Sequence, residues 1–104
     1  MIFVKSEREI DLMREPCAIV RDTLAAVGSA VRPGVSTAEL DRVAREYIRA
    51  RGAEPSCLGY CGYPASICAS VNEVIVHGIP SEDIVLKEGD IVSIDLCAYK
   101  NGFH

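Results

Sequence analysis

Long apolar runs are missing from this sequence. None approaches the roughly 18 consecutive apolar residues that a membrane-spanning helix needs. The first residues, MIFVKSERE, also place charges where a signal peptide would carry its hydrophobic stretch. We therefore expect a cytoplasmic protein with no membrane partner.

An excess of positive charge is missing as well. Lys and Arg total 11 against 15 Asp and Glu, so the formal net charge is -4. A chain with this balance has no broad basic surface that could hold a phosphate backbone. Nucleic acid is therefore not an expected partner.

Paired cysteine spacings are absent. The 5 cysteines are odd in number and follow no disulfide pattern, so we expect reduced thiols, most of them small core residues. Repeats, low-complexity tracts and interdomain linkers are absent too. With 104 residues, 49% of them hydrophobic and 25% charged, the sequence predicts one folded domain over residues 1–104.

Two amphipathic helices are predicted first. Ser6 and Glu9 have capping-box spacing, and Gly28 is placed to end the first helix. Its apolar face is predicted to comprise Ile10, Met13, Cys17, Val20, Leu24 and Val27. Pro16 should kink or break this helix. Ser36 and Glu39 repeat the capping spacing before a second helix that stops near Gly52.

Strands are predicted in the second half. Residues 67–71 and 73–76 are strand-like, and the clearest strand runs from Asp90 to Tyr99. Its alternation places Val92, Ile94, Leu96 and Ala98 on the core face and Ile91, Ser93, Asp95, Cys97 and Tyr99 on the other face. Asn101-Gly102 predicts a hairpin turn, after which Phe103 and His104 begin a partner strand. The predicted class is α/β in the α+β sense, with two helices followed by antiparallel strands.

Asp95 is the first candidate for chemistry. It is a carboxylate inside an apolar strand, where burial would require a partner such as a metal ion or a hydrogen-bonding group. A structural carboxylate and a metal ligand both remain open for this residue.

A second candidate region surrounds His77. This residue lies between the end of a predicted strand and a Gly/Pro turn. It is either a functional imidazole or a loop histidine bonded to backbone, and both interpretations stay open. The preceding stretch CLGYCGYPASIC combines Cys57, Tyr60, Tyr63 and Cys68. Flat rings and polarizable sulfurs suit a pocket for a thioether side chain, although ordinary packing beneath a loop also accounts for them.

A structural zinc site is the rival interpretation. Cys57 and Cys61 have a suitable first spacing, and Cys68 and His77 would complete the set. The second pair is separated by eight residues and a predicted strand, whereas structural zinc sites use two tight pairs. The spacing therefore argues against this alternative.

Several motifs resemble one family in order and spacing. GVSTAELD, CLGYCGYPASICASVNEVIVHGIP, EGDIVSIDL and NGFH together closely resemble type I methionine aminopeptidase, from Ser6 to the last residue. The VHGIP segment with a tyrosine-rich pocket favours this family over type II and over related Xaa-Pro-cleaving enzymes. The resemblance implies the pita-bread fold, two similar α/β halves around a two-metal centre, of which this chain would be the N-terminal half.

The resemblance also implies roles for individual residues. Asp95 matches a metal ligand, and His77 matches the histidine that contacts the substrate or its tetrahedral intermediate. The walls of the methionine pocket match Cys57, Tyr60, Tyr63 and Cys68. Carbonyl groups near Asn72 and Val74 match a monovalent-cation site of some members.

One departure limits what the chain should do. The family continues NGFH with Gly-Asp, whose aspartate bridges two divalent metals (Co, Mn, Fe or Zn), and further ligands and the general base follow later. A two-metal hydrolase needs both ions held about 3.5 to 4 Å apart, which Asp95 cannot achieve alone. We therefore expect an enzyme that removes N-terminal methionine from nascent, ribosome-associated chains, and an inactive 104-residue portion with little or no metal binding. The alternative is a non-catalytic binding or assembly module of the same fold that associates with itself through exposed apolar surface.

Overall fold

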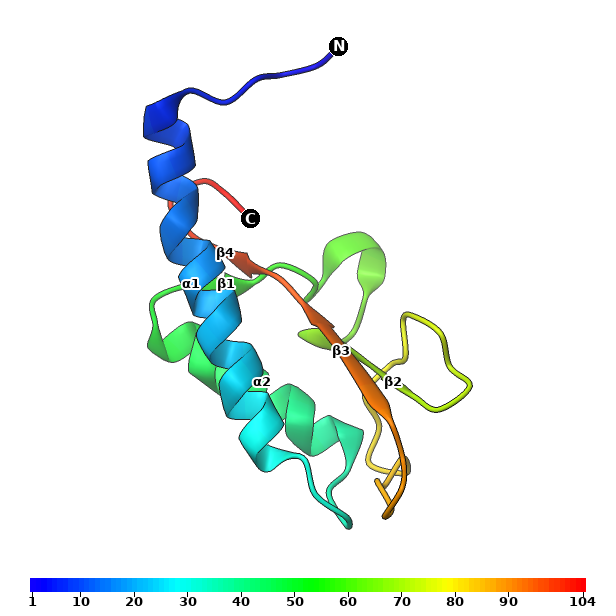
Figure 1. The fold of residues 1–104 in the computed structure, drawn as a ribbon. Helices are drawn as coiled ribbons and strands as arrows, with labels where there is room; N and C mark the ends of the chain where they lie inside the picture. Colours follow the sequence, from blue (N-terminus) through cyan, green and yellow to red (C-terminus); the bar gives the residue numbers. More distant parts are fainter.

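The computed structural model describes all 104 residues as two helices packed beside two short antiparallel strand pairs (Figure 1). Helix α1 covers Glu7–Ala30 and α2 covers Thr37–Ala50. The strands are β1 (Glu54–Pro55), β2 (Ile67–Val71), β3 (Val92–Leu96) and β4 (Ala98–Tyr99), and a 3-10 turn, η1, covers Tyr60–Gly62. None of the helices has the length and apolar character to cross a membrane. The predicted order of helices followed by antiparallel strands is confirmed.

The helix starts follow from local capping. The Ser6 hydroxyl accepts from the Glu9 amide at 3.3 Å, and the Glu9 carboxylate accepts from the Ser6 amide at 2.7 Å, so the predicted capping box forms. The Ser36 hydroxyl accepts from the Glu39 amide at 3.1 Å. Helix α2 ends at Ala50, two residues before Gly52, whose φ of 73° places it in the left-handed region.

The predicted end of α1 and the predicted break at Pro16 were wrong. The helix passes through Gly28 to Ala30, and the chain turns at Gly34, with φ of 93°. Pro33 explains the stop, because the residue before a proline disfavours helical backbone. Pro16 causes no break: α1 is continuous from Glu7 to Ala30.

The buried face of α1 differs from the predicted one. It comprises Pro16, Ile19, Thr23 and Val27, whereas Ile10 and Leu24 are 44% and 40% exposed. Thr23 can be buried because its hydroxyl donates to the Ile19 carbonyl at 2.6 Å. A polar residue with an internal acceptor is therefore compatible with the core, which an apolar-periodicity argument misses.

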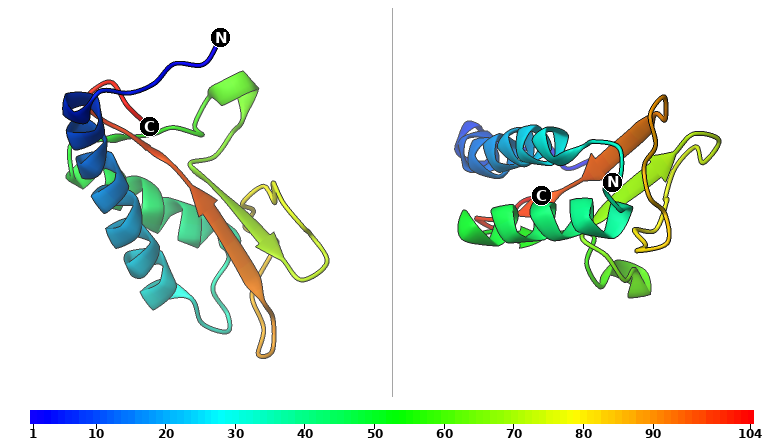
Figure 2. Two further views of the ribbon diagram at one scale, coloured as in Figure 1. Left: turned by 45° about the horizontal axis from the view of Figure 1, so that its top comes forward. Right: turned by 90° about the horizontal axis from the view of Figure 1, so that it is seen from below.

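The predicted long strand is two strands with different partners. β3 pairs with β2, while β4 pairs with β1, and the change occurs at Cys97. The predicted alternation is confirmed: Leu96 and Ala98 are buried, while Asp95 and Tyr99 are exposed. The core contains Ile19, Val27, Val35, Leu40, Ala44, Ile48, Ala53, Ile67, Ala69, Leu86, Leu96 and Ala98. This core lies between the helix pair and the strands. Figure 2 shows the helix pair and the strands from two further directions.

Two other strand predictions have different outcomes. Residues 73–76 form a turn and an irregular loop rather than a strand. Asn101 and Gly102, with φ of 57° and 83°, form the predicted tight turn, and Lys100 and Phe103 exchange two backbone hydrogen bonds across it at 2.9 and 3.0 Å. The turn places the C-terminal residues beside the N-terminal half of α1 (Figure 1).

Candidate functional site

A cavity of about 560 Å³ opens beside β2. Its lining consists of Cys57, Tyr60, Cys61, Gly62, Tyr63, Pro64, Cys68, His77 and Ile79. The five residues that the sequence predicted as substrate contacts therefore surround one cavity. Their roles in binding remain predictions.

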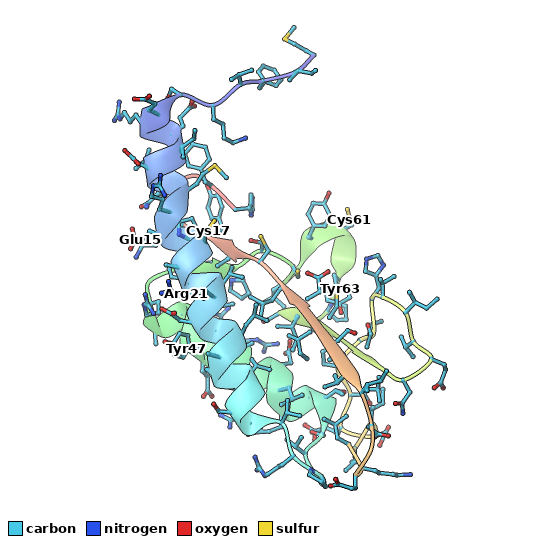
Figure 3. All side chains as sticks on the ribbon, viewed as in Figure 1. Glu15, Cys17, Arg21, Tyr47, Cys61 and Tyr63 are labelled. Carbon is cyan, nitrogen blue, oxygen red and sulfur yellow. The ribbon has the colours of Figure 1, made fainter.

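A closed turn supplies three of the aromatic and sulfur walls. The Gly59 amide donates to the Tyr63 carbonyl at 2.8 Å, and the Tyr63 amide donates to the Tyr60 carbonyl at 2.9 Å. Tyr60 is 73% exposed at the rim, whereas Tyr63 is half-buried. Figure 3 shows Cys61 at the outer end of this turn and Tyr63 nearer the strands.

Two residues of the cavity wall, Tyr63 and Cys57, have raised pKa values that favour their neutral forms. Burial and the neighbouring Cys68 thiol raise the pKa of Tyr63 well above its usual value. Burial is also the main cause that raises the pKa of the Cys57 thiol, with smaller effects from Cys68, Cys97 and Asp95. Neutral rings and sulfurs suit an unbranched apolar or thioether side chain.

His77 reaches the cavity from the loop that follows β2. Its backbone is left-handed, with φ of 59°. The next residue, Gly78, lies against the edge of β2, and its amide and carbonyl both bond to that strand. The sequence-based alternative of a loop histidine bonded to backbone finds no support, because the His77 ring has no hydrogen bond within the chain.

Asp95 is exposed, so the predicted burial of its carboxylate was wrong. It faces Cys68 across the strand pair, and directly opposed residues of an antiparallel pair project to the same face. Asp95 therefore lies on the non-core face of the sheet, the side of the cavity. Its effect on the pKa of Cys57 agrees with this position.

The chain does not by itself supply a metal centre. No group of three or more His, Cys, Asp or Glu side chains is placed to hold a metal ion. The zinc alternative built from Cys57, Cys61, Cys68 and His77 therefore lacks the required convergence, and Asp95 belongs to no set of three donors. A dinuclear site would need donors that these 104 residues do not offer.

Two sets of supporting residues were not predicted. Ser70 and Gly78 connect the His77 loop to β2, and Asp41 with Arg45 holds the start of β2. Asp41 was visible within GVSTAELD and Gly78 within VHGIP. Their roles depend on contacts between distant segments, which spacing alone does not reveal.

Comparisons with known proteins agree on one family. The profile of Metallopeptidase family M24 matches residues 11–104. Methionine aminopeptidases are 52% identical over all of this chain in Clostridium perfringens and 50% identical over 99% of it in Clostridium acetobutylicum. The chain spans 41% of the length of either relative.

A solved structure gives the same result for the fold. Methionine aminopeptidase from Thermotoga maritima superposes with a TM-score of 0.94 and 36% identity. The alignment covers 98% of this chain and 41% of that one. The pita-bread architecture implied by the sequence is confirmed.

Proposed function

Because the chain belongs to metallopeptidase family M24, we propose that it provides the methionine pocket and one metal ligand of an aminopeptidase that removes N-terminal methionine from nascent proteins. One observation carries the proposal. The cavity is walled by aromatic rings and thiols, with His77 in its lining and Asp95 on the same face of the sheet.

Each residue has a distinct proposed part. Cys57, Tyr60, Tyr63 and Cys68 hold the methionine side chain, and His77 contacts the scissile group or its tetrahedral intermediate. Asp95 is one ligand of a centre that takes divalent Co, Mn, Fe or Zn. The other ligands and the general base must come from outside residues 1–104, so these residues alone are proposed to be inactive. The proposed location is the cytoplasm, near ribosomes that release nascent chains.

The isolated chain gives the first test. Purified chain with added Co²⁺ or Mn²⁺ should release no methionine from a Met-Ala-Ser peptide, and calorimetric titration should detect little metal binding. Measurable turnover would contradict the proposed inactivity. Tight binding of a divalent metal would instead favour the alternative of an assembly module in which another copy supplies ligands.

A chimaera tests the catalytic parts directly. This chain would replace the matching 41% of the Clostridium perfringens enzyme, to which it is 52% identical. The chimaera should be active, and Asp95→Asn or His77→Ala should each lower kcat/KM at least about 100-fold, about 2.7 kcal/mol of transition-state stabilisation. Glu73→Gln, on the loop before His77, is the matched control and should change little. A folded chimaera that keeps its activity after Asp95→Asn would refute the assignment.

A further inference from the structure

We infer that Ser70 and Tyr63 are positioning residues that hold Gly78 against β2 and thereby fix the imidazole of the preceding residue, His77, at the cavity. The inference deepens the proposed function, because it concerns how His77 is placed for its contact with substrate. It is carried by hydrogen bonds, burial and backbone geometry at four neighbouring residues.

Gly78 is tied to β2 by two hydrogen bonds, and Tyr63 adds a third contact from outside the strand. Its amide donates to the Ser70 hydroxyl at 3.0 Å, and its carbonyl accepts from the Ala69 amide at 2.8 Å. The Tyr63 hydroxyl donates to the Ile67 carbonyl at 2.9 Å and lies 3.4 Å from the Gly78 carbonyl. Two side chains from different segments therefore meet at one residue, Ser70 at its amide and Tyr63 at its carbonyl.

The approach of the loop to β2 is closer than a side chain allows. A Cβ on Gly78 would lie 2.2 Å from the Ala69 carbonyl oxygen and 2.8 Å from the Ser70 Cα, both of them backbone atoms. Only glycine fits against the strand at this position. The close approach brings the neighbouring His77 to the cavity rim.

The apolar side chains of the loop do little to hold it in place. Val74, Ile75 and Val76 are 43%, 86% and 61% exposed, so their burial contributes little to the placement of His77. His77 itself has φ of 59°, a conformation that is unfavourable for a residue with a Cβ. Such a conformation persists only where its surroundings impose it, and the bonds to Gly78 are the contacts that do so.

The two positioning residues differ in one respect. Tyr63 lines the cavity, whereas Ser70 is 4% exposed and is not part of the cavity lining. Removing the Ser70 hydroxyl should therefore disturb His77 without changing the pocket wall. This difference separates positioning from substrate contact.

The first test uses the 104-residue chain. NMR of Ser70→Ala should show amide exchange at Gly78 at least about 10-fold faster than in the unsubstituted chain, with the His77 backbone coupling constant moving away from its left-handed value. Ser93→Ala is the matched control, because Ser93 faces Ser70 across the strand pair but has no hydrogen bond to the loop. Unchanged exchange and coupling in folded Ser70→Ala would overturn the inference.

The second test separates positioning from general stability. In the chimaera, Ser70→Ala should lower kcat about 10-fold while KM changes less than twofold, and Tyr63→Phe should alter both. Equal kcat for Ser70→Ala and Ser93→Ala would overturn the positioning role. An inactive unsubstituted chimaera would contradict the proposed function, while the NMR measurement would still decide whether Ser70 fixes His77.

Discussion

Tyr63 should make the stability of this protein sensitive to alkaline pH. Its pKa in the folded chain is raised above the usual value of 10.0, mainly by burial and then by Cys68. A group with a raised folded pKa stabilises the protein fully below its unfolded pKa, and this contribution is lost as pH rises beyond it. Urea denaturation from pH 9 to 11 should therefore show a steeper loss of stability for the unsubstituted chain than for Tyr63→Phe. Parallel profiles would contradict this.

Among the carboxylates, removal of Asp41 should lower the free energy of unfolding most. It is 6% exposed and accepts hydrogen bonds from the Ser66 and Ile67 amides at 2.7 and 3.0 Å. It also forms an ion pair with Arg45 at 2.7 Å. Asp41→Ala would leave buried donors without an acceptor, so the free energy of unfolding should fall by about 3 kcal/mol.

The control for Asp41 is a pair of the same charge type on the surface. Asp11 and Arg14 lie 3.1 Å apart with both side chains 74% exposed. Asp11→Ala should change the free energy of unfolding by less than about 0.5 kcal/mol, as exposed pairs do. Urea denaturation of both variants is the measurement, and equal effects would show that burial of Asp41 is unimportant.

At the scale of an element, α1 tolerates an interior proline because another segment compensates for it. Pro16 has no amide hydrogen for the Leu12 carbonyl, and the Asn101 side-chain amide lies 3.4 Å from that oxygen. The same amide donates to Glu15 at 3.0 Å, and Lys100 forms an ion pair with Glu15 at 2.8 Å. Figure 3 labels Glu15 on the N-terminal half of α1. The hairpin turn therefore completes the helix.

A double-mutant cycle measures this compensation. Asn101→Gly keeps the positive φ of the turn but removes the side-chain amide. It should lower the free energy of unfolding, measured by urea denaturation, by about 1 kcal/mol. In a Pro16→Ala background the Leu12 carbonyl regains a helical donor, so the cost of Asn101→Gly should shrink by roughly 0.5 kcal/mol. Strict additivity of the two substitutions would show that the amide does not replace the missing donor.

The sequence could predict the elements whose signals are local. Ser6 and Ser36 act on amides three residues away, and Asn101-Gly102 closes its own turn, so these boundaries were predicted correctly. The division of the last strand at Cys97 could not be predicted, because it depends on pairing with β1, more than 40 positions earlier. The loop at 73–76 was mistaken for a strand for a related reason: the edge of β2 is occupied by Gly78 instead.

The candidate site shows the same limit. Residue types identified the cavity lining, since rings, sulfurs and His77 have characteristic chemistry. The exposure of Asp95 was missed, because apolar neighbours along a strand do not reveal whether the face opposite the core is covered. Ser70 was missed because a serine in a strand carries no signal until its partner at Gly78 is known.

At the scale of the whole molecule, the chain is more open than its size requires. Its accessible surface is 6692 Å², against about 5,700 Å² for a compact protein of its mass. The radius of gyration is 14.7 Å, against about 13 Å for a compact chain of this length. The segment Met1–Val4 is 81% to 106% exposed, and it adjoins a groove lined by Phe3, Val4, Lys5, Ile10, Met13, Arg14 and Cys17.

This apolar surface predicts reversible self-association of the 104-residue chain. Burying such side chains between two copies removes apolar area from water at about 25 cal/mol per Å². Sedimentation velocity from roughly 5 to 200 µM should show mass rising with concentration, and Phe3→Ser should weaken the association. Ile75→Ser is the matched control, because Ile75 is 86% exposed on the loop beside the cavity, outside the groove. If Ile75→Ser weakened association as much as Phe3→Ser, the contact would involve the cavity side, and a single monomeric species at every concentration would contradict self-association itself.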